Sequence, residues 1–227
     1  EDNMALKLEW LRTRLELDAA QLRKMVLTHP PLLTKSVEDN IAPKLDWLQR
    51  RLGLDDAGLR KIVVRLPKLL IYSVEDNLEP KLEWLQTRLD LDAVQLKYVV
   101  VTLPQLLSLS VEDNLAPKLD WLQTRLDLDA GQLRKIVLRA PAVLGYSVED
   151  NMEPKLEFLA REIGLSCAEL RDWVVKNPSC LGYSLASRYR PRIEACRAAG
   201  VDTKRVLSYG SRADEIFCEK IGIAPEA

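Results

Sequence analysis

The stretch SVEDNLEPKLEWL, residues 73–85, combines the pattern of an amphipathic helix with a proline in its interior. Its apolar residues Leu78, Leu82 and Leu85 are spaced by 4 and 3, which places them on one face of a helix. Pro80 follows seven residues after Ser73, a residue type that favours helix N-termini. The stretch therefore predicts a helix that must accommodate a proline.

The same stretch recurs along the chain every 37 residues. An asparagine marks one position of the recurrence, at Asn3, Asn40, Asn77, Asn114 and Asn151. Prolines keep the same interval in two columns, which are Pro43, Pro80, Pro117, Pro154 and Pro191, and Pro30, Pro67, Pro104, Pro141 and Pro178. Such a period is typical of solenoids, because one repeat cannot bury its apolar face without a neighbour. The sequence predicts an all-α, curved helical-repeat solenoid, a superhelix of 37-residue repeats with two α-helices and a short third helical turn each.

The start of each repeat leaves two alternatives for its first helix, shown by residues 36–52. If Asn40 caps the helix, Pro43 falls in the first turn, where its missing N–H has no helical partner to lose. If Ser36 caps the helix, Pro43 must bend it. Either way we expect a change of direction near Asn40, and its repetition predicts superhelical curvature. Gly53 is expected to end this helix in a left-handed conformation.

The second half of each repeat predicts another helix and a single turn. In the second repeat the helix is expected from Asp55 to Pro67, and the equivalent starts in four of five repeats carry the capping-box pattern, as in Asp18-x-x-Gln21. The segment KLLIY, residues 68–72, is too short for an α-helix and is expected to form one turn that buries its leucines. Five repeats fill residues 1–185, and a degenerate sixth repeat with a C-terminal cap occupies 186–227.

The overall composition excludes several classes of protein. Thirty-three basic and 34 acidic residues give a net charge of −1, so attraction to polyanions requires charge gathered on one face. There is no apolar run of about 18 residues, so no membrane contact is expected. The four cysteines, Cys167, Cys180, Cys196 and Cys218, lack zinc-site spacing and are interpreted as reduced core thiols in a reducing compartment. The chain opens within a repeat, and we expect it to be part of a longer product that carries any targeting segment.

The repeat resembles that of the mitochondrial transcription termination factor (mTERF) family. The likeness is carried by LDLDAGQLRKIVLRAPAVLGYSVEDNMEPKLEFL, residues 126–159, in its Leu-x-Leu, its Leu-Arg-Lys-Ile-Val core, its proline before apolar residues, and its Tyr-Ser-Val-Glu-Asp-Asn. All five repeats carry this pattern, with local departures. The resemblance implies a non-enzymatic protein of mitochondria or chloroplasts that binds nucleic acid, usually double-stranded DNA and sometimes RNA, in transcription termination, regulation of organelle gene expression or RNA maturation. We expect a monomer.

Basic residues form columns along the repeats and supply a candidate binding surface. One column follows the proline (Lys7, Lys44, Lys81, Lys118, Lys155 and Arg192), and aliphatic burial with a solvated amine could explain it. Another ends the first helix (Arg14, Arg51, Arg88 and Arg125), as the helix dipole favours. Bases on the second helix are more concentrated and could follow a phosphate backbone. The predicted nucleic-acid-binding residues are Arg23, Lys24, Arg60, Lys61, Arg65, Arg134, Lys135, Arg139, Arg171, Lys176, Arg188, Arg190 and Arg192.

Aromatic residues leave room for both structural and functional interpretations. The column Trp10, Trp47, Trp84, Trp121 and Phe158 lies next to the leucine stripe, which favours core packing over stacking on bases. Tyr189 lies between Arg188 and Arg190, and this interleaving would suit stacking on a base. No catalytic constellation, metal site, cofactor motif or glycine-rich phosphate loop recurs, which argues against an enzyme. The remaining alternatives are a nucleic-acid-binding protein and a helical-repeat scaffold for other proteins.

Overall fold

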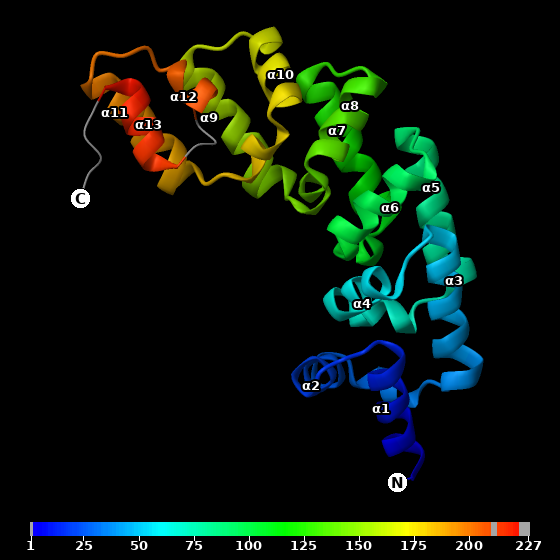
Figure 1. Cartoon of the computed structure of the whole chain (residues 1–227). Coiled ribbons are helices and arrows are strands. Elements are labelled where there is room, and N and C mark those ends of the chain that lie inside the picture. Colours follow the sequence, from blue (N-terminus) through cyan, green and yellow to red (C-terminus); the bar gives the residue numbers. More distant parts are fainter. Residues whose placement is uncertain (1, 210–212, 223–227) are drawn as a thin grey trace. The chain divides into compact units, whose positions relative to one another are not determined.

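The computed structural model describes residues 2–209 and 213–222, and within these ranges it contains helices and turns but no β-strand. The chain divides into two compact units, unit 1 over Glu1–Leu115 and unit 2 over Ala116–Ala227. Each unit contains pairs of helices separated by short helical turns, as the period predicts. The all-α, helical-repeat architecture is confirmed (Figure 1).

Unit 1 contains the α-helices α1 (Asp2–Arg14), α2 (Ala19–Thr28), α3 (Ala42–Leu52), α4 (Asp56–Arg65), α5 (Glu79–Leu89) and α6 (Ala93–Thr102). Its short turns are η1 (Pro30–Thr34), η2 (Val37–Ile41), η3 (Pro67–Ile71), η4 (Val74–Leu78), η5 (Pro104–Ser108) and η6 (Val111–Leu115). In Figure 1, α3 and α5 form one layer and α4 and α6 form another. Helix α6 packs against both α3 and α4 of the preceding repeat, and the turns η1, η3 and η5 stack on one another.

Unit 2 contains α7 (Ala116–Leu126), α8 (Ala130–Arg139), α9 (Glu153–Ile163), α10 (Cys167–Lys176), α11 (Arg190–Ala198), α12 (Arg205–Tyr209) and α13 (Asp214–Ile221). Its short turns are η7 (Pro141–Gly145), η8 (Val148–Met152), η9 (Pro178–Gly182) and η10 (Leu185–Tyr189). Helix α10 packs against α7 and α8 in the way that α6 packs in unit 1. After α11 the pairing pattern ends, and α12 lies between α11 and α13. Residues 210–212 and 223–227 of the expected cap lie outside the described residues.

The proline near the start of the first helix is accommodated by a single π-turn. The Ser36 hydroxyl accepts a hydrogen bond from the Asp39 N–H at 3.0 Å, and the Ile41 N–H donates to the Ser36 carbonyl five residues back. This π-turn is wider than an α-helical turn, so the regular α-helical hydrogen bonds are interrupted just before Pro43. In a regular α-helix the proline ring would clash with the carbonyl of the preceding turn. The Asn40 cap is therefore not the alternative used: Asn40 instead accepts from the Lys44 ammonium at 3.3 Å.

The second helices begin and end as the sequence predicts. The four expected capping boxes are present, at Asp18, Asp92, Asp129 and Ser166. Asp55 accepts from the Gly58 N–H without the reciprocal bond, because glycine has no side chain to return it. Each second helix stops before a proline, where a 3₁₀ turn begins and buries its apolar residues.

The lysine that follows each first-helix proline is buried and makes a hydrogen bond within its own repeat. The Lys44 ammonium donates to the Leu70 carbonyl and that of Lys81 to the Leu107 carbonyl, both at 2.7 Å across 26 residues. Lys118 and Lys155 make the equivalent bonds in unit 2. The bond joins the first helix of a repeat to its 3₁₀ turn. Since these amines are buried and bonded within the fold, a solvated amine does not explain the column. Burial lowers the pKa of each of the four lysines.

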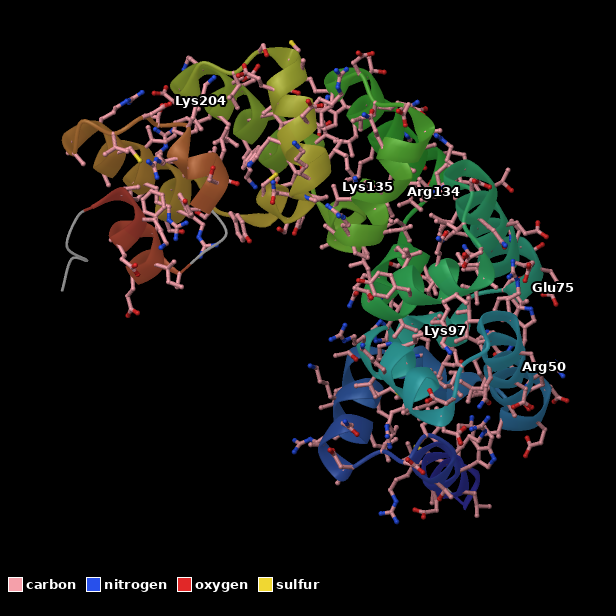
Figure 2. The ribbon with its side chains drawn as sticks, turned by 45° about the horizontal axis from the view of Figure 1, so that its top comes forward. Arg50, Glu75, Lys97, Arg134, Lys135 and Lys204 are labelled. Atoms are coloured by element: carbon pink, nitrogen blue, oxygen red, sulfur yellow. The ribbon has the colours of Figure 1, made fainter. Side chains whose placement is uncertain are left out.

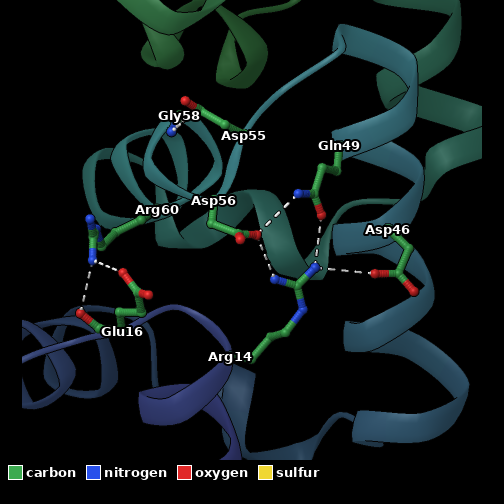
Figure 3. A network of polar contacts seen from close by, with 8 residues as sticks. All are labelled: Arg14, Glu16, Asp46, Gln49, Asp55, Asp56, Gly58 and Arg60. Atoms are coloured by element: carbon green, nitrogen blue, oxygen red, sulfur yellow. Dashed lines mark hydrogen bonds and ion pairs between the residues drawn. The ribbon is translucent and has the colours of Figure 1, made fainter.

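The arginine that ends the first helix joins successive repeats. Arg14 contacts Asp46 at 3.3 Å, Asp56 at 3.2 Å and Gln49 at 2.8 Å, all in the next repeat (Figure 3). Arg51 and Arg125 instead bond to a glutamate at the start of the next repeat's first helix, Glu79 at 2.7 Å and Glu153 at 2.9 Å. These residues therefore link repeats within each unit.

The aromatic and thiol predictions are confirmed only in part. Phe158 is buried, whereas the four tryptophans of its column are half-buried. All four cysteines are free; Cys180 and Cys196 are buried in leucine positions, but Cys167 is exposed, so the core interpretation is wrong for it. Cys167 is the first residue of α10, and its side chain faces solvent there.

Candidate nucleic-acid interface

The second helices α2, α4, α6, α8 and α10 carry the basic residues that the sequence singled out. Because the repeats have one length, equivalent residues occupy the same place on each helix. Two columns of bases lie at adjacent positions and so point in different directions, about 100° apart around the helix. The structure gives these two columns different environments.

The first of these columns, Arg23, Arg60, Lys97, Arg134 and Arg171, is largely used inside the fold. The Arg60 guanidinium bonds to the Glu16 carboxylate at 2.6 Å and to the Glu16 carbonyl at 3.3 Å (Figure 3). Arg171 bonds to Asp127 in the same two ways, at 2.7 and 3.3 Å. Lys97 donates to the Gly53 carbonyl. In each case the base reaches the residue 44 positions earlier, at the end of the preceding repeat's first helix.

These partner residues share a left-handed backbone conformation that presents their carbonyl oxygens. The φ angles are 47° at Glu16, 57° at Gly53 and 50° at Asp127. A left-handed residue ends the helix and leaves nearby carbonyls without intrahelical donors. The cation therefore meets both the negative end of a helix dipole and, at Glu16 and Asp127, a carboxylate. Arg134 is half-buried and also has a partner.

The second column is exposed. Lys24 and Lys61 in unit 1 and Lys135 in unit 2 are solvent-exposed, and their ammonium groups form no hydrogen bond or ion pair with the described residues. Figure 2 shows Lys135 beside Arg134 on α8. The ammonium groups of this lysine column are open to an external anion.

Two further predicted residues bridge repeats near the ends of second helices. Arg65 donates to the Thr102 carbonyl at 3.3 Å, and Arg139 donates to the Lys176 carbonyl at 2.8 Å. Each guanidinium therefore satisfies a C-terminal carbonyl of the next second helix. Because a guanidinium has five N–H donors and both side chains are exposed, each retains donors for a phosphate. Lys176 itself is exposed.

In unit 1 the lysine column borders an open groove of about 550 Å³. Lys24 and Arg65 line it together with the apolar side chains Met25 and Pro67. Gln105 of the third repeat also lines it. The groove thus brings cations from two successive repeats to one concavity.

The C-terminal arginine cluster is less available than the sequence indicated. Arg188 lies over the Tyr183 ring at 4.4 Å and Arg190 over the Phe158 ring at 4.7 Å. Arg192 is only 3% exposed, occupies the buried lysine column and donates to the Tyr209 carbonyl at 3.2 Å.

Tyr189 cannot serve as a stacking platform. Its side chain is fully buried, and its hydroxyl donates to the Cys180 carbonyl at 2.9 Å. Burial raises the pKa of Tyr189 above its ordinary value. The stacking interpretation is therefore wrong, because Tyr189 occupies the apolar position held by Met152 one repeat earlier.

The structure also reveals a surface residue that the sequence analysis missed. Tyr98 is 48% exposed and occupies the position of Lys24 and Lys61 on α6. Val94, one turn earlier on the same helix, is also exposed. Aligning the repeats shows that Tyr98 replaces a lysine. The sequence alone does not show that this position on the second helices faces solvent, so the exposure of Tyr98 came only from the structure. The third repeat therefore offers an aromatic and apolar surface where its neighbours offer ammonium groups.

Among residues 2–209 and 213–222, there is no cluster of side chains suited to a metal ion. None of the described helices has the length and apolar character needed to cross a bilayer.

Taken with the repeat geometry, these surfaces define an all-α helical-repeat protein whose second helices present exposed cations. The mTERF family profile matches residues 48–211, and the chain belongs to the mTERF family. A comparison with curated protein sequences gave no match. The mTERF family consists of nucleic-acid-binding helical-repeat proteins of organellar gene expression, and it is generally not enzymatic.

Proposed function

We propose that this protein binds double-stranded DNA through the exposed face of its second helices, and acts in transcription termination or the regulation of gene expression in mitochondria or chloroplasts. Family membership supports nucleic acid as the ligand. The observation that carries the choice of surface is the exposed lysine column of Lys24, Lys61 and Lys135, whose ammonium groups have no hydrogen-bond or ion-pair partner among the described residues. Arg65 extends this surface in unit 1, and Arg139 and Lys176 extend it in unit 2.

Charge favours contacts with phosphates over contacts with base edges. The lysines occupy the same position in the first, second and fourth repeats, and a flexible ammonium group makes a point contact with phosphate without reading sequence. The first two repeats are net basic, whereas the third and fifth are net acidic. Affinity should therefore come mainly from the first two repeats and should fall steeply with salt.

The proposal is tested by fluorescence anisotropy with the full chain as salt is raised from 50 to 200 mM. Duplex DNA and single-stranded RNA of equal length are the two ligands, and an acidic protein is the control. We expect duplex DNA to bind best, with affinity falling about tenfold or more for each two to three phosphates contacted, in line with counterion release over this range. Equal or stronger binding to RNA would overturn the choice of DNA. An affinity that does not depend on salt would overturn the proposed surface.

A matched pair of variants locates the contact. Lys61→Glu changes the charge of the lysine column, and Arg50→Glu makes the same change at an exposed residue of the first-helix layer. Figure 2 shows Arg50 projecting from unit 1 on the side away from Lys97. Lys61→Glu should weaken binding at least tenfold, whereas Arg50→Glu should change it by less than about twofold. Equal losses would mean that only net charge matters.

The exposed Val94 and Tyr98 favour a second candidate, a scaffold that binds another protein through α6. This reading predicts no salt-dependent binding to either nucleic acid and no effect of Lys61→Glu. The same titration therefore distinguishes the two functions.

A further inference from the structure

Val94 on α6 is an exposed apolar side chain that the packing of the fold does not explain. It is 75% exposed and is the second residue of its helix. The residues at the same position of the preceding and following repeats are Ala57 on α4 and Gly131 on α8. Valine is less favourable than alanine in a helix, because its branched side chain loses rotamer freedom there. Neither burial nor helix propensity therefore accounts for the isopropyl group.

Val94 lies one helical turn before the column of exposed lysines. Lys61 follows Ala57 by four residues on α4, and Tyr98 follows Val94 by four residues on α6. Residues four apart lie on the same face of a helix, about 6 Å apart along its axis. Both positions are exposed on both helices. Val94 therefore adds an apolar group to the face that carries the lysine column, one turn closer to the helix N-terminus.

The cations on this face indicate what Val94 contacts. Within unit 1, Lys24, Lys61 and Arg65 are exposed and give the face a positive charge that complements phosphate. The major groove of B-form DNA admits an α-helix, and recognition helices contact base edges with residues near their N-termini. A second helix that enters the groove in this way places the lysine position at the backbone and the residue one turn earlier at a base edge. The Val94 side chain has no hydrogen-bonding group, so its match on a base edge is the 5-methyl group of thymine.

We infer that Val94 contacts the 5-methyl group of a thymine in the major groove and makes the third repeat selective for thymine at one position of the DNA. This inference rests on the proposed function and adds one base-edge contact to the phosphate contacts of the lysine column. It also gives a physical reason for preferring DNA to RNA. Uracil lacks the methyl group, and the major groove of an RNA duplex is too deep and narrow for side chains to read.

The test compares two duplexes that differ only in their methyl groups. Anisotropy is measured with the full chain on a duplex of A·T base pairs, and on the same duplex with every thymine replaced by deoxyuridine. We expect the thymine duplex to bind about fourfold tighter, the factor for taking one methyl-sized group out of water. The slope of log affinity against log salt should be the same for both, because the phosphate contacts are unchanged. Equal affinities with a steep salt slope would overturn the inference and leave the proposed function standing.

A matched pair of variants assigns the preference to Val94. Val94→Ser removes the apolar group without changing charge, and stability should stay nearly unchanged because the side chain is exposed. This variant should bind the thymine and deoxyuridine duplexes equally well. Leu6→Ser removes a 71% exposed apolar side chain from α1 and should retain the full preference. A thymine preference that survives in Val94→Ser would place the methyl contact elsewhere and overturn the inference.

A second pair of duplexes separates the methyl group from the shape of A·T-rich DNA. In a G·C duplex, 5-methylcytosine presents a methyl group on the same groove edge as thymine. Replacing cytosine by 5-methylcytosine should raise the affinity of the unsubstituted chain but not that of Val94→Ser. A thymine preference without this gain would mean that duplex shape is read instead, and would overturn the inference. If none of the four duplexes shows salt-dependent binding, the proposed function fails and the inference fails with it.

Discussion

The Arg60 guanidinium joins both the carboxylate and the backbone carbonyl of Glu16, at 2.6 and 3.3 Å, and so connects two repeats across 44 residues of sequence. The adjacent Lys61 makes no such contact and faces solvent. Neighbouring bases on one helix therefore have separate roles. One holds the repeats together, and the other is open to a ligand.

This separation predicts opposite effects of two alanine substitutions. Arg60→Ala should lower the free energy of unfolding by about 0.2–1 kcal/mol, the range for a partly exposed ion pair. Its effect on DNA affinity should be small. Lys61→Ala should leave stability unchanged and reduce the slope of log affinity against log salt by about 1. Denaturant titration and salt-titrated anisotropy measure the two quantities. A loss of both properties in both variants would contradict the separation.

Gly53 tests the left-handed end of the first helix. Its φ is 57°, and a Cβ added there would meet no atom within 4 Å, so only backbone strain opposes a substitution. Gly53→Ala should cost about 1 kcal/mol. Gly53→Asp should cost less, because aspartate tolerates this conformation at Asp127 and would add a carboxylate near Lys97. Thermal and urea unfolding give the comparison. Equal costs for the two variants would count against a favourable Lys97 contact.

Leu122 tests the apolar stripe of α7, since its side chain is 1% exposed. Leu122→Ala removes buried methyl groups and leaves a cavity, so we expect a loss of about 2–5 kcal/mol in the free energy of unfolding. Thr124→Ala, at an exposed position on the same helix, is the control and should change stability by less than about 0.5 kcal/mol. Similar losses for both variants would show that the buried face is misassigned.

The repeats explain how much of this fold was predictable. The period, the helix pairs, the caps such as Asp129, and the 3₁₀ turn after each proline depend on residues close in sequence, so pattern and propensity were sufficient. The sequence did not show which residue caps the first helix before its proline, because a cap at Ser36 and a cap at Asn40 both satisfy local rules. Only the π-turn, which depends on packing of the whole repeat, distinguishes them.

The candidate site was less predictable, because a column of bases does not reveal its own partners. Arg60 and Lys61 are adjacent and equally basic in sequence. The difference arises because the offset of 44 residues places one of them against Glu16 of another repeat. The same limit applies to Tyr189, whose flanking arginines suggested a surface, while its column position belongs to the core. Repeat register, rather than local charge, decides which side chains are exposed.

The hydrogen bond from the buried Lys81 to the Leu107 carbonyl gives a prediction for stability and its pH dependence. Lys81→Met keeps the aliphatic stem but leaves the Leu107 carbonyl without its donor, which should cost about 1–3 kcal/mol. Because burial lowers the pKa of Lys81 below its unfolded value of 10.5, the unfolded state binds more protons in that interval, and this lysine's contribution to stability rises with pH there. The cost of Lys81→Met should therefore be larger at pH 10 than at pH 8, as denaturant titration can show. Lys68→Met, at an exposed lysine, should show neither effect.

Tyr98 provides the most direct gain-of-function test of the proposed interface. It stands where Lys24 and Lys61 stand in the two preceding repeats of unit 1, and half of its side chain is exposed. Tyr98→Lys would continue the column by one residue, so we expect tighter DNA binding and a salt slope that steepens by about 1. Tyr98→Gln removes the ring without adding charge and should not increase affinity. If Tyr98→Lys weakens binding as much as Tyr98→Gln does, the ring itself contacts the ligand, and the third repeat contributes a nonpolar contact in place of a phosphate contact.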